Sequence, residues 1–170
     1  RIAQPAAEGR PHHGRGLLGS VVDETAYRNA KGEINRQPCV FERALLARTA
    51  VCELAMAHQI AERETFACSQ SAAHRECQQL AELLRQKSAF ALGITDTQRI
   101  LPHAMVMKIQ CGGLLGMKSV FDPEALAPNV RRLLRLAREQ HGELDSLPFS
   151  EIVKGVAAWK PRRRHGGSAP

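Results

Sequence analysis

Residues 41–64 read FERALLARTAVCELAMAHQIAERE, and the prediction of the fold class depends mainly on this stretch. It is rich in Ala, Leu, Glu and Arg and contains neither glycine nor proline, which favours a long helix. On a helical wheel the apolar residues form two stripes, one through Val51 and Leu54 and another through Cys52 and Met56. We therefore expect a central helix that packs against partners on two sides.

Four further segments are expected to be helical, because each has the apolar period of a helix or a recognisable end signal. Glycines mark three of the expected ends, and the glycines from 112 to 116 are interpreted as a C-terminal helix cap. The four segments are 71–92, 95–113 with a break at Pro102, 129–141 and 148–159.

The predicted fold class is all-α, an irregular bundle of about five helices over residues 39–160. Composition agrees, because only 4% of the residues are aromatic and strands prefer aromatic and β-branched side chains. Residues 1–38 contain three prolines and five glycines, which predicts an extended N-terminal arm. Residues 161–170 are expected to form a short basic C-terminal tail.

The net charge of +7 is concentrated at the two ends of the chain. Residues 148–170 hold five basic and one acidic group, whereas residues 39–147 hold thirteen and twelve. An acidic partner would therefore be attracted mainly by the ends. No apolar run is long enough to span a membrane, and five widely spaced cysteines are typical of a reducing cytoplasm. The chain does not begin with Met, so an N-terminal segment could have been removed.

The cysteines are the one group of residues that suggests a chemical site. The gaps between them are 12, 15, 8 and 33 residues, which excludes the short C-x-x-C motifs of zinc fingers and bacterial ferredoxins. A metal site would therefore have to be assembled by the fold. Cys52 lies in the middle of the expected first helix and fits worst. The predicted ligands of an Fe–S cluster or zinc are Cys39, Cys68, Cys77 and Cys111.

Other interpretations of the cysteines stay open. Reduced cysteines are among the most buried residues of protein cores, so all five could simply pack. A disulfide or redox switch is a further alternative. His74 stands three residues before Cys77, a spacing compatible with a mixed Cys/His zinc site.

A second hypothesis is nucleic-acid binding. An arginine stripe on one helix and a basic tail would both attract phosphates. No recognisable nucleic-acid-binding motif accompanies them, and aromatic residues for base stacking are scarce. A solvated helix face or a contact with a protein partner would give the same pattern. The residues concerned are Arg131, Arg135, Arg138, Lys160, Arg162, Arg163 and Arg164.

The sequence contains no P-loop, dinucleotide fingerprint or nucleophile elbow, so an enzyme is the third hypothesis. The preferred function is a non-catalytic accessory or interaction subunit of a larger protein assembly, binding an Fe–S cluster or zinc. A small RNA- or DNA-binding protein is the alternative.

Overall fold

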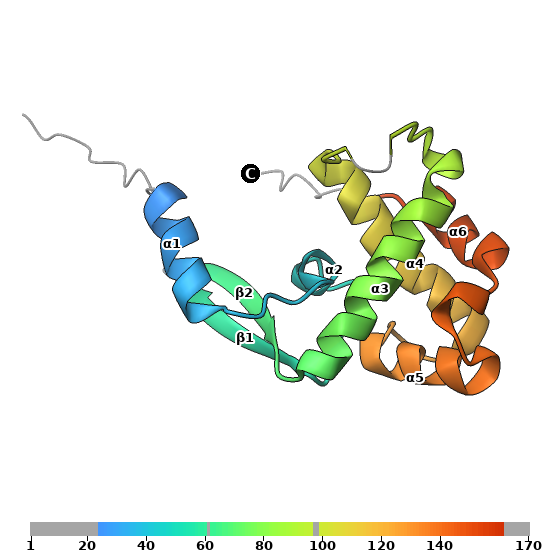
Figure 1. Ribbon diagram of the computed structural model, residues 1–170, viewed down its shortest axis with the longest axis horizontal. Helices are drawn as coiled ribbons and strands as arrows, with labels where there is room; N and C mark the ends of the chain where they lie inside the picture. Colours follow the sequence, from blue (N-terminus) through green and yellow to red (C-terminus); the bar gives the residue numbers. More distant parts are fainter. Residues whose placement is uncertain (1–23, 61, 97–98, 162–170) are drawn as a thin grey trace, which may run out of the picture.

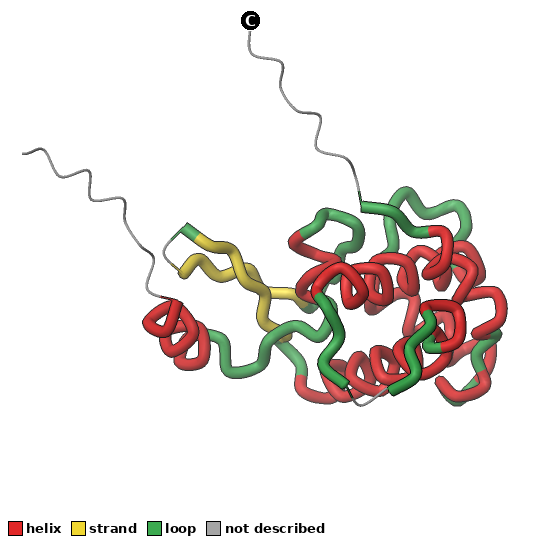
Figure 2. The backbone as a smooth tube through the Cα atoms, turned by 90° about the horizontal axis from the view of Figure 1, so that it is seen from above, coloured by secondary structure: helices red, strands yellow, loops and turns green. Residues whose placement is uncertain are grey.

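The computed structural model describes residues 24–60, 62–96 and 99–161. Helices α3 to α6 pack together into one body, and a β-hairpin extends from it with α1 at its side (Figures 1 and 2). Two short 3-10 turns, Phe90–Leu92 and Leu144–Ser146, connect helices of the body. The main elements are α1 (Glu24–Ile34), α2 (Glu42–Leu46), β1 (Ala55–Ile60), β2 (Arg63–Cys68), α3 (Ser71–Ser88), α4 (His103–Phe121), α5 (Val130–His141) and α6 (Phe149–Ala158).

The all-α prediction is wrong, because the expected long helix is replaced by α2 and a two-stranded antiparallel sheet. The hairpin pairs Ala55 with Cys68 at its base and Ile60 with Arg63 at its tip. The chain leaves α2 through Arg48, whose φ of 54° is left-handed and cannot continue a helix. Phe66 and the residues beside it in β2 are buried, so tertiary burial overrides the helix preference of this sequence.

Helix α1 lies inside segment 1–38, where we expected an extended arm. It has no buried residue, and polar contacts hold it against the hairpin. The Arg63 guanidinium lies 4.6 Å from the centre of the Tyr27 ring, and Lys31 forms a 2.8 Å ion pair with Glu42. These partners are distant in sequence, which is why local pattern did not indicate the helix. Residues 1–23 and 162–170, with the predicted Arg162, Arg163 and Arg164, lie outside the described residues.

The helical body agrees best with the sequence patterns. Gly93, with a φ of 63°, stops the chain after α3 and its 3-10 turn. The Asn129 side chain accepts a hydrogen bond from the Arg132 N–H and caps α5, which ends at Gly142 as expected. In the described part of the chain, no helix is both long and apolar enough to cross a membrane.

The glycines from 112 to 116 do not end a helix, and this interpretation was also wrong. They lie within α4, where Gly112 and Gly116 face α6 and Gly113 faces Leu84 of α3. A Cβ on Gly112 would come within 2.6 Å of the Val156 Cα, and one on Gly116 would overlap the Ile152 carbonyl. Gly155 of α6 faces the same contact from the other side. The glycines therefore allow the two helix backbones to touch, which no larger residue would permit.

Gly116→Ala should destabilise the protein by about 2–3 kcal/mol, the upper range for overpacked cores, because the new methyl group meets backbone atoms. The matched control is Gly32→Ala in α1, where a Cβ meets nothing within 4 Å and alanine raises helix propensity by up to about 1 kcal/mol. Urea unfolding followed by circular dichroism measures both changes. Equal stability of the two variants would contradict the close α4–α6 packing.

Candidate thiolate site

Four of the five cysteines line one small cavity, which we call the thiol cavity. Its other walls are largely apolar, with His74 and Arg131 as the residues of basic type. The cavity lies at the base of the hairpin, beside the first half of α3 and the start of α5 (Figure 1). The four cysteines come from four different segments of the chain and are Cys39, Cys52, Cys68 and Cys77.

Backbone pairing holds Cys39 and Cys68 beside each other. The N–H of Cys39 donates to the Phe66 carbonyl at 2.8 Å, and the N–H of Cys68 donates to the Gln37 carbonyl at 2.9 Å. The segment before α2 thus runs as a short third partner along the outer edge of β2, with Pro38 opposite Ala67. Two thiols far apart in sequence are fixed in this way by main-chain hydrogen bonds.

Cys52 and Cys77 approach the cavity from other directions. Val51 pairs with Asn129, giving hydrogen bonds of 2.9 Å on both sides of the bridge, so Cys52 is fixed against the start of α5. Cys77 lies on α3, one turn after the buried Ala73. The same helical turn presents His74, whose Nε2 lies 3.0 Å from the Pro38 carbonyl and therefore carries the proton.

Backbone N–H groups point at two of the sulfurs. Burial raises the pKa of the Cys39 thiol to about 11, and the Phe41 N–H partly opposes this. Burial also raises the pKa of Cys52, against N–H groups of Leu54 and Arg131. Hydrogen bonds of this kind stabilise a thiolate, and they are common around sulfur ligands of metal centres.

The pKa of Cys77 depends on burial and on the other three thiols of the cavity. Burial and, to a smaller extent, the other three thiols of the cavity raise the pKa of its thiol to about 12, and Arg131 acts in the opposite direction. Each of these thiols is thus close enough to disfavour ionisation of its neighbours. Four ionised thiols could share this cavity only if a cation or cationic cluster bound them.

The structure brings together three of the four predicted ligands, and Cys111 is not one of them. Cys111 is completely buried on α4, within the main apolar core, and its thiol bonds to the Thr49 side chain. The fourth cysteine of the thiol cavity is Cys52 instead. Cys52 was excluded from the predicted ligands because a continuous helix was expected through residues 41–64. Recognition of the hairpin would have returned Cys52 to that set.

The thiols of the cavity are not grouped as the ligands of a metal ion. Among the described residues, no three His, Cys, Asp or Glu side chains form a group that could hold a metal ion. Sulfurs around a single zinc lie about 4 Å apart, because each Zn–S bond is about 2.3 Å. The four thiols nevertheless border a common space, a cavity of about 10 Å³ with room for about one water-sized sphere.

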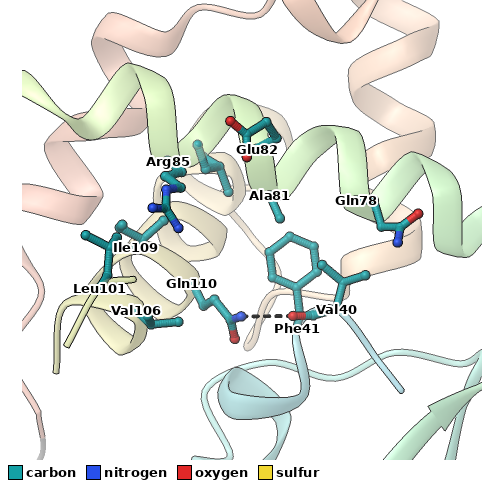
Figure 3. A pocket seen from close by; sticks show the side chains of 11 residues that line it. Val40, Phe41, Gln78, Ala81, Glu82, Arg85, Leu101, Val106, Ile109 and Gln110 are labelled. Carbon is teal, nitrogen blue, oxygen red and sulfur yellow. Dashed lines mark hydrogen bonds between the residues drawn. The ribbon is translucent and has the colours of Figure 1, made fainter. Parts of the chain in front are cut away.

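A second cavity, of about 260 Å³, adjoins the same segment (Figure 3). Phe41 lies in its floor, and Arg85 and Glu82 of α3 reach its edge. Gln110 of α4 donates a 2.8 Å hydrogen bond to the carbonyl of Val40, a residue that lines both cavities. This bond ties the turn after Cys39 to the helical body and limits its movement.

The predicted arginine stripe of α5 is largely occupied by ion pairs. Arg131 and Arg138 both bind Glu76 of α3, the latter at 3.3 Å, and Arg135 pairs with Glu139 at 3.8 Å. Arginines that already pair with carboxylates attract phosphates less than free arginines would. Lys160, the remaining described member of the predicted basic set, lies beside Trp159 at the edge of another cavity.

The raised thiol pKa values predict a loss of stability at alkaline pH. Folded Cys39 and Cys77 remain protonated up to about 11 and 12, whereas unfolded thiols ionise near 9. Their contribution is therefore complete below about pH 9 and is lost as pH rises toward 12. Urea midpoints of the reduced, metal-free protein at about pH 8 and about pH 10.5 measure this. A Cys39→Ser, Cys77→Ser variant should show a shallower decline, and an identical decline would contradict the buried thiols.

Comparison of the chain with protein-family models, with curated proteins and with solved structures found no match in any of the three. The function of the thiol cavity therefore has to be inferred from the chemistry of its own residues.

Proposed function

We propose that this chain is a non-catalytic iron–sulfur subunit in which Cys39, Cys52, Cys68 and Cys77 bind one [4Fe–4S] cluster. The observation that carries the proposal is that four thiols from four separate segments line one cavity. Four cysteine thiolates are the normal ligand set of such a cluster.

A cluster and a zinc ion require different spacings of their sulfur ligands. Sulfur ligands of a [4Fe–4S] cluster stand roughly 6–7 Å apart, because they bind the four corners of a cube. Zinc would require them to be about 4 Å apart. Mononuclear zinc is therefore the competing outcome, and metal analysis separates the two.

The surroundings of the thiols also suit a cluster. N–H groups from Phe41, Leu54 and Arg131 point at sulfurs, and hydrogen bonds to sulfur stabilise the anionic cluster and tune its potential. Most other residues of the wall are apolar, which limits access of water. The nucleic-acid alternative has less support, because the α5 arginines already bind carboxylates.

The test is anaerobic reconstitution of the full chain with ferrous iron and sulfide. The wild-type protein should turn brown and hold about four iron and four sulfide per chain. Ser substitution at Cys39, Cys52, Cys68 or Cys77 should each lower cluster content strongly and destabilise the loaded protein, because ligation free energy is also folding free energy. Iron and sulfide analysis and the visible spectrum give the readout.

Cys111→Ser is the matched control, because Cys111 is a buried thiol outside the cavity. It should keep full cluster content even if it unfolds more easily. Circular dichroism of each metal-free variant shows whether the fold has survived. Cluster loss in Cys111→Ser but not in Cys52→Ser would restore the ligand set expected from sequence, and stoichiometric zinc without iron would overturn the cluster.

A further inference from the structure

A groove runs along one face of α4, between the end of α6 and the segments that follow α2 and precede α5. We call it the tryptophan groove. It consists of two adjoining hollows of about 700 and 450 Å³, which share Met107, Trp159, Lys160 and Pro161. The bordering face of α4 extends from His103 to Leu115, which is about 18 Å at a rise of about 1.5 Å per residue. None of its described lining residues borders the thiol cavity, so its properties do not depend on a cluster.

The walls of the tryptophan groove are mainly apolar. Trp159 leaves the end of α6 beside Gly112, since its Cβ would lie 3.0 Å from a Cβ on that glycine. Met107 and Trp159 pack against the core but are only partly buried, and Leu126 in the loop before α5 is fully exposed. Tryptophan is enriched among the residues that dominate protein interfaces, and methionine is common at adaptable binding surfaces. The groove thus presents apolar surface that the rest of the described chain leaves uncovered.

The charged side chains at the groove are basic. Lys108 and Lys160 line it, and none of the described lining residues is acidic. In the described part of the chain neither lysine has an ion-pair partner, whereas Arg48 at the end of α2 pairs with Glu64 at 2.8 Å. The sequence continues after Pro161 with three more arginines. The groove therefore repels a basic partner and attracts one that carries carboxylates.

We propose that the tryptophan groove is a docking site for an acidic amphipathic helix of a partner protein. About three turns of such a helix match the bordering face of α4 in length. Its apolar residues at i, i+3, i+4 and i+7 contact Met107, Leu126 and Trp159, and carboxylates at its edges pair with Lys108 and Lys160. Single-stranded nucleic acid fits less well, because it binds by stacking bases on several aromatic side chains, and Trp159 is the one Trp, Tyr or Phe among the described lining residues.

Trp159 reports the binding directly, because it is the single tryptophan of the chain. The full chain, reduced and metal-free, is titrated with a synthetic helical peptide of about 14 residues that carries Leu at i, i+3, i+4 and i+7 and Glu at the other positions. This Glu peptide should shift the tryptophan emission saturably to shorter wavelength. A peptide with Lys in place of Glu, and a scrambled Glu peptide without an apolar face, should each bind at least about tenfold more weakly.

Two pairs of variants test the charge and the apolar wall separately. The Lys108→Glu, Lys160→Glu double variant should weaken the Glu peptide at least about tenfold and allow the Lys peptide to bind. Its control, Arg28→Glu with Arg135→Glu, makes the same change in charge at exposed positions outside the groove.

For the apolar wall, Leu126→Asp should weaken the Glu peptide, whereas Phe90→Asp, at an equally exposed position that lines neither hollow, should not. Circular dichroism shows that each variant keeps the fold.

Three results would overturn the docking site. The first is the absence of a saturable shift with the Glu peptide. The second is equal weakening by a variant and its control, because this would show general charge or surface effects. The third is a larger shift with an oligothymidylate of about 15 nucleotides than with the Glu peptide, with a steep dependence on salt, because the partner would then be a nucleic acid.

Discussion

The carboxylate of Glu42 is the interaction that joins the hairpin to the rest of the molecule. It accepts hydrogen bonds from the Lys31 ammonium, the Thr65 hydroxyl and the Phe66 N–H, and so connects α1, α2 and β2. Partial burial raises the pKa of Glu42, but these three donors outweigh it and lower the pKa overall. A half-buried charge with all its donors in place is stabilising, whereas one without them would be costly.

The same network determines the spacing of the proposed ligands. Cys39 lies three residues before Glu42, and Cys68 lies two residues after Phe66, so the network holds both thiols at the hairpin base. The buried Asn35 adds hydrogen bonds from its side chain to Thr65 and the Phe66 carbonyl. The thiol cavity is thus built on long-range polar contacts rather than on a local motif, which explains why the cysteine spacings match no known pattern.

Local signals predicted the elements whose ends are set locally. Helix α5 follows from Asn129 and Gly142, because a cap and a stop act within one turn of the chain. The hairpin could not be predicted in this way, since its sequence has good helix formers and no Asn-Gly or Asp-Gly turn. Its stability comes from Glu42 and from burial of Phe66, both of which depend on the finished fold. The glycines inside α4 were wrongly interpreted as a helix end for a similar reason. Only the close packing of α4 against neighbouring helices explains them.

The cysteines show how one wrong element changes a predicted site. Three expected ligands lie at the cavity, but Cys52 was rejected because a mid-helix thiol cannot reach a loop site, and the helix does not exist. The arginine stripe was interpreted as a candidate nucleic-acid surface, and the structure places its members in ion pairs with Glu76 and Glu139. Sequence gives residue type and local period, whereas the surroundings of these side chains depend on which charges and sulfurs the hairpin and α5 bring together.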